Sequence, residues 1–349
     1  MSKSIISKIL FLISLSLITA GLVLIYSQIS QEKFKLISPV SQEKDTKAKI
    51  LDKYTIENLK LKKFPAGKII LNEILDDNDN FSSRLFYFYD NDATVSGLIN
   101  IPKISKPQGI IILLRGYVDQ EVYQTGIGTK RMGEFLSENG FITLSPDFLG
   151  YGKSSSPSVY PLEERFQTYT TALSLLASLP NLPEALIEKI PSIPSDFTAD
   201  NIGLFGHSNG GHITLTVLEI TGQNYPTVLW APVSKPFPYS ILYYTDEFED
   251  KGKSLRKLVA DFEKDYQSYL YSIDEYFDYI NAPLQIHQGK ADQEVPVWWS
   301  DELVEILKEK NKKVEYFTYL NEDHNFNQGS WNSAASRNLN FFRQHHSTP

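Results

Sequence analysis

The chain has 349 residues, of which 42% are hydrophobic and 22% charged, enough for one large α/β domain with an insertion. Its formal net charge of −8 argues against nucleic acid as a main partner. The absence of cysteine excludes a disulfide framework, a thiolate nucleophile and cysteine-ligated zinc. Outside the C-terminal tail no histidine pair has metal-site spacing, so we expect neither a metal nor another cofactor.

Residues 1–33 predict an uncleaved signal anchor. A leader containing Lys3 and Lys8 precedes the uncharged run from Ile9 to Tyr26, which is about long enough to cross a bilayer as a helix. The basic leader indicates a cytoplasmic N-terminus and an extracytoplasmic domain. The alternative is secretion after cleavage, but Thr19-Ala20-Gly21 matches a cleavage site poorly. We therefore expect a single-pass protein of the cell membrane.

The chain then passes through a tether into a folded domain. Residues 34–53 are polar, rich in Lys and Glu and without periodicity, and the domain is expected over 54–346. Early strands are predicted at 68–75, 84–89 and 94–100, with a turn at 76–80. Strands and helices alternate thereafter, which is typical of a largely parallel sheet covered by helices.

The run Gly206-His207-Ser208-Asn209-Gly210-Gly211 fits G-x-S-x-G, the nucleophile elbow. An apolar strand at 201–205 leads into it, and a helical run at 212–218 leads out. A sharp strand-to-helix turn presents the serine hydroxyl, and the glycines allow strand and helix to approach closely. Ser208 is therefore the predicted nucleophile of a hydrolase.

Residues 234–281 are rich in Tyr, Phe and acidic residues and predict two or three helices that form a cap over the site. The aromatic side chains are candidates for lining a substrate pocket; alternatively, most of them attach the cap to the domain. Because acidic residues outnumber basic ones here, we also predict a preference against anionic substrates. The aromatic residues concerned are Tyr243, Tyr244, Phe248, Tyr266, Tyr269, Tyr276 and Phe277.

Asp292 is the predicted acid of a catalytic triad. In α/β-hydrolases with such an elbow, the serine is followed along the chain by Asp or Glu and then by His. Asp292 follows the strand at 283–287, in a loop at its carboxyl end, where it would orient an imidazole. Glu294 and Asp323 are its rivals, and the alternative role for Asp292 is to cap a helix that starts near Val297.

His324 is the predicted base, because it lies in the loop after the strand at 314–320, at the sheet edge where such sites form. It would take the proton of Ser208 and return it to the leaving group. The other downstream histidines are expected to pack or cap (His212), to pack at a strand end (His287) or to lie in a disordered tail (His345 and His346).

Two backbone amides are predicted to bind the oxyanion. One is that of Asn209, the residue after the nucleophile. The other is that of Tyr117, in the loop after the strand at 109–114, which we take as the third strand of the fold. Arg115 lies in the same loop, and we expect it to bind neighbouring carboxylates structurally rather than to act in catalysis.

With the triad, the runs Arg115-Gly116-Tyr117 and Asp147 to Ser154 give a pattern that resembles the α/β-hydrolase superfamily. The Ser-Asn-Gly-Gly elbow, the segment from Asp292 to Pro296 and the aromatic helix around Phe341 are most similar to the catalytic domain of the prolyl oligopeptidase family. The resemblance runs roughly from Leu85 to His345, with no β-propeller ahead of it. It implies an α/β-hydrolase fold with a mostly parallel eight-stranded sheet, helices on both faces and a helical cap.

The resemblance also implies a function. It predicts a serine-type peptidase that cleaves small peptide or ester substrates through an acyl-enzyme. Because tyrosine hydroxyls can serve the oxyanion hole in prolyl oligopeptidases, Tyr117 is expected to donate through its amide or its hydroxyl. Arg115-Gly116 replaces the family's His-Gly, and with the missing propeller this favours the alternative of a carboxylesterase or deacylase without peptidase activity. A catalytically silent surface binding protein is a third reading, against which the intact triad argues.

Overall fold

The computed structural model describes residues 49–104 and 106–346. The predicted signal anchor and most of the predicted tether lie outside these residues. Within them, no helix is long and apolar enough to cross a membrane. The described chain is already folded ahead of the predicted domain start at Tyr54, because Asp52–Tyr54 form a 3₁₀ turn in which Tyr54 is buried.

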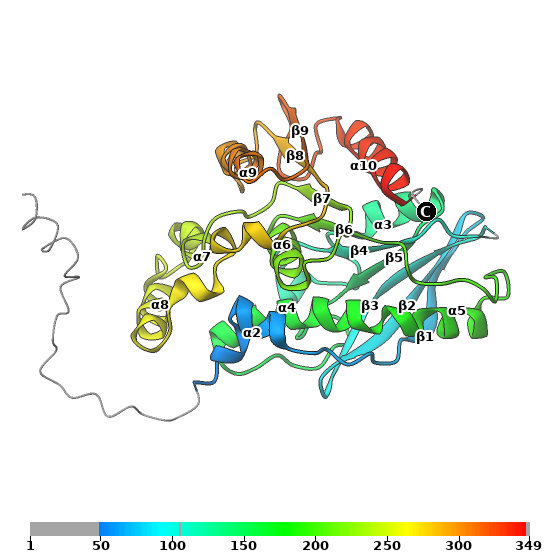
Figure 1. Cartoon of the computed structure of the whole chain (residues 1–349), viewed down its shortest axis with the longest axis horizontal. Coiled ribbons are helices and arrows are strands. Elements are labelled where there is room, and N and C mark those ends of the chain that lie inside the picture. Colours follow the sequence, from blue (N-terminus) through cyan, green and yellow to red (C-terminus); the bar gives the residue numbers. More distant parts are fainter. Residues whose placement is uncertain (1–48, 105, 347–349) are drawn as a thin grey trace, which may run out of the picture. The chain divides into compact units, whose positions relative to one another are not determined.

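Nine strands of the described chain form one sheet in the order β1-β2-β3-β5-β4-β6-β7-β8-β9 (Figure 1). Strands β4 to β9 run parallel, whereas β1, β2 and β3 pair antiparallel with one another and β3 pairs antiparallel with β5. The predicted mostly parallel sheet is therefore present. The strands are β1 (Ile70–Asp77), β2 (Phe81–Asp90), β3 (Ala93–Pro102), β4 (Ile110–Leu114), β5 (Ile142–Pro146), β6 (Ile202–His207), β7 (Thr227–Trp230), β8 (Leu284–Gly289) and β9 (Val314–Tyr319).

The prediction of eight strands was wrong by one, because β1 adds an edge strand to the sheet. Most of its residues are exposed, and it is held by its backbone pairing with β2. The Asn78 side-chain oxygen accepts hydrogen bonds from the amides of Asn80 and Phe81, which closes the turn between the two strands. Strand β1 therefore extends to Asp77, into the predicted turn at 76–80. The strand at 109–114 is accordingly the fourth along the chain.

Helices cover both faces of the sheet, as the alternation along β4 illustrates. Ile110 and Ile112 pack into a core that includes α4 and α6, whereas Ile111 and Leu113 pack into a second core that includes α3 and α10 (Figure 1). The helices are α2 (Ile56–Leu61), α3 (Lys130–Glu138), α4 (Pro161–Ser178), α5 (Leu182–Lys189), α6 (Asn209–Thr221), α7 (Tyr239–Leu242), α8 (Lys253–Asp265), α9 (Val297–Glu309) and α10 (Trp331–His346).

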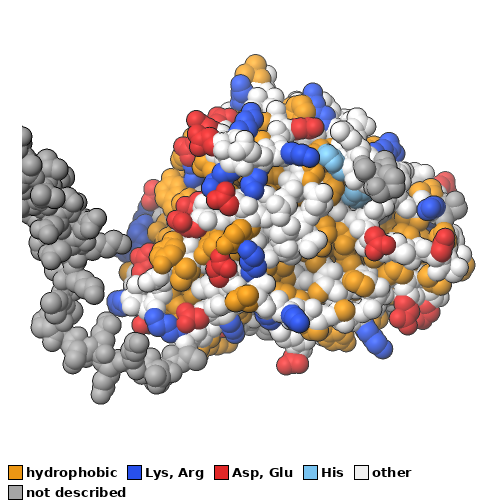
Figure 2. Space-filling model, in the orientation of Figure 1, with side chains coloured by type: hydrophobic (Ala, Val, Ile, Leu, Met, Phe, Trp, Pro, Cys, Tyr) orange, Lys and Arg blue, Asp and Glu red, His pale blue; other side chains and the backbone are white. Residues whose placement is uncertain are grey.

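The insertion between β7 and β8 contains α7, α8 and several 3₁₀ turns, as predicted in outline. Phe262 of α8 is buried, and its ring lies 6.4 Å from that of Phe166 of α4. Tyr243 and Tyr244 contact Trp299 of α9, with ring centroids 4.8 and 6.3 Å apart. These aromatic side chains attach the insertion to the domain. On the face seen in Figure 2, acidic and basic side chains are interspersed.

Candidate active site

Ser208 occupies the turn between β6 and α6, with φ = 58° and ψ = −122°. A positive φ is uncommon for a residue with a Cβ and persists only where the surroundings fix it. The Ser208 amide donates to the Trp230 carbonyl at 2.9 Å, and the Ser208 carbonyl accepts from the amides of Gly211 at 2.9 Å and Val233 at 3.0 Å. The elbow is therefore held by the end of β7, the segment after it and the first turn of α6.

Two glycines beside Ser208 stand where a side chain would not fit. A Cβ on Gly210 would lie 1.9 Å from the Leu114 carbonyl oxygen at the end of β4. A Cβ on Gly116 would lie 2.9 Å from the Cβ of Ser208. The close approach of helix, strand and oxyanion loop at the elbow thus requires glycine at both positions.

Asp292 lies in the loop after β8 with its side chain fully buried, and each carboxylate oxygen accepts two hydrogen bonds. Oδ1 accepts from the amides of Glu294 and Val295, both at 2.9 Å. Oδ2 accepts from Gln288 Nε2 at 3.0 Å and from His324 Nδ1 at 2.8 Å. Four donors therefore satisfy this carboxylate and fix its orientation toward His324.

His324 lies in the loop after β9 and is held at two points. Its Nδ1 donates to Asp292, which leaves Nε2 with the lone pair that a general base needs. Its backbone carbonyl accepts from His207 Nε2 at 2.9 Å, and the two imidazole rings lie 4.6 Å apart. Burial is the main cause that lowers the pKa of His207 to about 3, so His207 is a neutral donor.

The structure brings Asp292 and His324 into direct contact, whereas no hydrogen bond joins Ser208 Oγ to His324 among the described residues. His207, which precedes Ser208, links the elbow to the His324 loop. In enzymes without bound substrate, the hydrogen bond between nucleophile and base is often long and forms only in the complex. The placement of Ser208 relative to the Asp292–His324 pair is thus compatible with a triad.

Neither rival of Asp292 makes a hydrogen bond to the His324 ring among the described residues. Glu294 is exposed, and Asp323 accepts from the amides of Asn325 and Asn327, so it organises its own loop. The alternative that Asp292 only caps a helix is also wrong, because its backbone donors precede α9, and no side chain caps the start of that helix.

The two predicted oxyanion donors face one cavity. Neither the Asn209 nor the Tyr117 amide has an intramolecular acceptor among the described residues, so both are available to a substrate. The Tyr117 hydroxyl donates to Asp119 Oδ1 at 2.7 Å, and this bond is the main cause that raises its pKa to about 12. The Tyr117 ring is 74% exposed. These contacts favour donation by the amide over the hydroxyl.

Arg115 has a structural environment that differs from the predicted one. Its guanidinium donates to the carbonyl oxygens of Gly116 at 2.9 Å and Asp147 at 3.0 Å, not to a carboxylate. It also lies over the ring of Tyr151, 4.1 Å from the centroid. Arg115 therefore fixes the oxyanion loop through backbone carbonyls and aromatic contacts. The buried Asp147 carboxylate is bound instead by the hydroxyls of Ser96, Tyr123 and Thr125.

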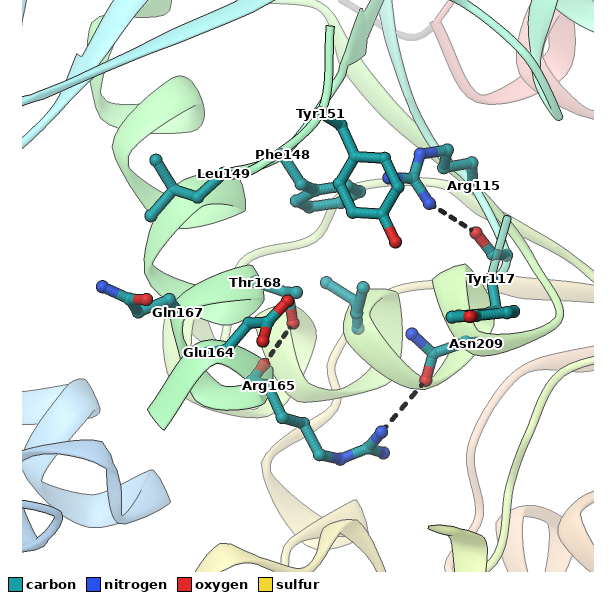
Figure 3. A pocket seen from close by; sticks show the side chains of 12 residues that line it. Arg115, Tyr117, Phe148, Leu149, Tyr151, Glu164, Arg165, Gln167, Thr168 and Asn209 are labelled. Carbon is teal, nitrogen blue, oxygen red and sulfur yellow. Dashed lines mark hydrogen bonds between the residues drawn. The ribbon is translucent and has the colours of Figure 1, made fainter. Parts of the chain in front are cut away.

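A cavity of about 190 Å³ opens beside the oxyanion donors (Figure 3). Figure 3 shows Arg165 reaching from α4 to Asn209, across the cavity from the rings of Phe148 and Tyr151. The contribution of α4 was not predicted, because its polar lining residues match no catalytic motif. The lining residues are Arg115, Gly116, Tyr117, Phe148, Leu149, Tyr151, Glu164, Arg165, Gln167, Thr168, Asn209 and Ile213.

None of these lining residues comes from the insertion at 234–281. The alternative that the aromatic residues attach the insertion to the domain is therefore the better description of Tyr243 and Tyr244, which contact Trp299, and of Tyr266, whose hydroxyl accepts from the Leu51 amide. Phe248 and Tyr269 are exposed. The insertion does not form the wall of this cavity.

The remaining histidines have other roles. His212 is buried with Nδ1 3.0 Å from the Val233 carbonyl oxygen, and His287 is buried between Tyr319 and Gln285. Both were predicted to pack. The expectation of a disordered tail at His345 and His346 was wrong, because both belong to α10 and the His346 ring contacts Phe141. In the described chain, no group of three or more acidic or histidine side chains could hold a metal ion.

Residues 193–348 match the model of the prolyl oligopeptidase family. The uncharacterized peptidase YtmA of Bacillus subtilis (strain 168) is 26% identical to this chain over 245 residues, which cover 68% of this chain and 84% of YtmA. The resemblance to the prolyl oligopeptidase family is confirmed, and a serine hydrolase is supported.

Two solved structures show the same fold. Pyrococcus horikoshii acylaminoacyl peptidase aligns over 77% of this chain with a TM-score of 0.52 and 18% identity, and this chain spans only 41% of that protein. Acetyl xylan esterase 1 from Thermoanaerobacterium sp. aligns over 83% of this chain and 93% of its own length, with a TM-score of 0.52 and 15% identity. The fold is therefore that of the α/β-hydrolases.

Proposed function

We propose that this chain, whose residues 193–348 carry a prolyl oligopeptidase family domain, is a serine hydrolase that acts through Ser208, Asp292 and His324. The observation that carries the proposal is the buried Asp292–His324 pair, linked through His207 to a strained serine elbow. A serine hydroxyl becomes nucleophilic when a positioned base removes its proton. His324 has its Nε2 available for that step.

The proposed reaction runs through an acyl-enzyme. Ser208 Oγ attacks the substrate carbonyl while His324 Nε2 accepts its proton, and Asp292 stabilises the imidazolium. The Asn209 and Tyr117 amides bind the oxyanion of the tetrahedral intermediate, a contact worth about a hundredfold to a thousandfold in rate per donor. His324 then protonates the leaving group, and water repeats the sequence to release the acyl group and restore Ser208.

We favour peptide-bond cleavage, because the family match and the similarity to YtmA, which is named a peptidase, both indicate it. A carboxylesterase or deacylase is the second candidate. The specific observation in its favour is the small size of the cavity beside the oxyanion donors, which suits a short acyl group. The same acyl-enzyme chemistry would cleave esters in either case, so amide turnover is the discriminating activity.

The test is kcat/KM on ester and amide substrates that share one acyl group, with Ser208→Ala as the control. Amide turnover that disappears in the variant would identify a peptidase. Ester turnover alone would identify an esterase. A folded protein that turns over neither substrate, and whose Ser208 is not labelled by a fluorophosphonate, would point to the silent binding protein instead.

We further propose that the protein is anchored in the cell membrane through residues 1–33, with its catalytic domain outside the cytoplasm. The uncharged run from Ile9 to Tyr26 and the basic leader before it support this placement. Secretion after cleavage of the leader is the alternative.

A further inference from the structure

The cavity beside the elbow lies on the acyl side of the proposed reaction centre. Its walls include Gly116, Tyr117 and Asn209, but no residue of the loops that carry Asp292 and His324. The leaving group must receive its proton from His324 and therefore lies toward that histidine. The part of the substrate that stays on Ser208 is then the part that enters the cavity.

Arg165 is the cavity residue whose hydrogen bonds are least complete. Its Nη1 donates to the Asn209 side-chain oxygen at 3.5 Å, which is a long contact. Its Nε and Nη2 are buried and have no acceptor, and no carboxylate of the described chain forms an ion pair with it. Arg165 as a whole is half-buried, but these two guanidinium nitrogens are shielded from water and no counter-ion lies beside them, so an anion from outside the chain would be bound favourably here.

The groups that surround Arg165 do not neutralise it. The charge of Arg165 acts on Tyr169 and His212, whose rings stack on each other, and neither the Tyr169 hydroxyl nor His212 Nε2 makes a hydrogen bond of normal geometry. Burial and then the charge of Arg165 lower the pKa of His212 to about 3, so that imidazole is neutral. Arg115, the other cation of the cavity, is already bound by two carbonyl oxygens. Glu164 is exposed and makes no ion pair among the described residues.

We propose that Arg165 binds a carboxylate carried by the acyl part of the substrate. In peptide terms this is an acidic residue on the amino side of the cleaved bond; in ester terms it is a short dicarboxylic acyl group. The inference rests on the proposed function and deepens it. A cavity of about 150 Å³ holds a benzene molecule, so one of about 190 Å³ accommodates a side chain of glutamate size.

The guanidinium can reach such a carboxylate with little rearrangement. Its bond to the Asn209 side chain is long, so a rotation that turns its donors into the cavity gives up little. The substrate carboxylate then replaces a weak neutral acceptor with a charge-assisted, bidentate one. The acidic insertion, which predicts a preference against anionic substrates, contributes nothing to this cavity. The charged side chains that line it are Arg115, Glu164 and Arg165, and of the two cations only Arg165 has two guanidinium nitrogens without an acceptor.

The experiment uses the full-length protein and the α-ethyl esters of N-acetyl-glutamate and N-acetyl-glutamine. The two acyl groups have nearly the same shape and differ in charge, and peptidases and esterases of this mechanism both cleave esters. We expect kcat/KM to favour the glutamyl ester in the wild type. In Arg165→Met this preference should fall by about 10- to 100-fold, mainly through KM of the glutamyl ester, since a hydrogen bond to a charged group is lost.

Three further variants sharpen the result. Arg165→Lys should keep part of the preference, because lysine keeps the positive charge but lacks the planar pair of donors that binds a carboxylate bidentately. Glu164→Gln should increase the preference, because it removes a repelling carboxylate from the rim. Arg131→Met, which removes an exposed guanidinium that stacks on Trp331 on α10, should leave the preference unchanged.

Two results would overturn the inference. One is a wild type that hydrolyses both esters without preferring the glutamyl one. The other is an Arg165→Met variant in which both esters lose kcat in parallel, which would make Arg165 a positioning residue for Asn209. Failure of the proposed function would look different, because neither ester would be hydrolysed and Ser208 would not react with a fluorophosphonate.

Discussion

The Asp292 carboxylate receives only one of its four hydrogen bonds from His324. The other three come from Gln288 and from the amides of Glu294 and Val295. These donors hold the carboxylate in place whether or not the histidine is charged. Removal of the whole side chain would leave these three donors without an acceptor and destabilise the loop, whereas an isosteric amide changes mainly the partner of His324.

We predict that Asp292→Asn lowers kcat by about a thousandfold to ten-thousandfold, because the amide no longer holds His324 with Nε2 as acceptor. Steady-state kinetics on the ester that the wild type turns over best would measure it, with the thermal midpoint recorded for each variant. Glu294→Gln is the control and should stay close to wild type, since that side chain is exposed. A fully active Asp292→Asn protein would remove Asp292 from the site.

At the scale of elements, α6 is a helix buried on nearly all sides that carries an acidic residue. Glu219 is fully buried, and neither of its carboxylate oxygens has a hydrogen-bond partner among the described residues. Burial and, secondarily, the charge of Asp274 raise the pKa of Glu219 well above its usual value of 4.5. The folded protein therefore keeps a proton on Glu219 at a pH where the unfolded chain has lost it.

This pKa shift predicts a pH-dependent stability. Between pH 4.5 and the raised pKa, the folded state binds one proton more than the unfolded state, so the free energy of unfolding decreases as pH rises. The slope for one proton is at most about 1.4 kcal/mol per pH unit. Glu219→Gln removes this proton uptake, so its stability relative to wild type should increase with pH in urea titrations at several pH values.

A matched control is available in the loop before α10. Glu322 is also buried, but it accepts hydrogen bonds from the amides of Gln328 and Ser330. Glu322→Gln should lower the free energy of unfolding at neutral pH. Each carboxylate oxygen of Glu322 accepts one hydrogen bond, whereas the NH₂ group of a glutamine cannot accept one, so one of the two backbone amides would lose its partner. A gap between Glu219→Gln and wild type that stays constant with pH would contradict the assignment of a proton to Glu219.

The insertion at 234–281 is predicted to contribute to stability rather than to acyl selectivity. Phe262 of α8 is buried against Phe166, Phe237 and Tyr271. Phe262→Ala should lower the free energy of unfolding by about 3–5 kcal/mol, as truncation of a buried aromatic ring typically does. The preference among acyl groups should remain that of the wild type, measured on the folded variant. A changed preference would show that the insertion contacts the substrate.

The sequence predicted the acid and the base of the site but not the cavity beside them. The loops with Asp292 and His324 could be placed because each follows an apolar strand, and parallel strands bring their carboxyl ends to one edge. The residues of the edge strand β1 predicted a strand at 68–75, although the family resemblance implied a sheet of only eight strands. The sequence could not predict that Arg165 lines the cavity. The face of α4 that borders the elbow is set by packing against α6, and no spacing along the helix indicates it.

At the scale of the whole molecule, the described residues, 49–104 and 106–346, contain every residue of the proposed chemistry. One compact unit begins at Lys49. Catalysis and attachment to the membrane are then separable in principle. The proposed anchor would concentrate the enzyme at a surface without taking part in the reaction, since no residue of 1–33 is needed to build the elbow, the acid or the base.

We predict that the full-length protein sediments with membranes and is released by detergent but not by high salt, because the run from Ile9 to Tyr26 is uncharged and about bilayer length. A variant lacking residues 1–33 should appear in the soluble fraction with an unchanged kcat/KM. External protease should reach the domain in intact cells, since the proposed topology keeps the basic leader inside. Soluble wild-type protein outside the cells, with a mass that shows loss of the leader, would replace the anchor by secretion.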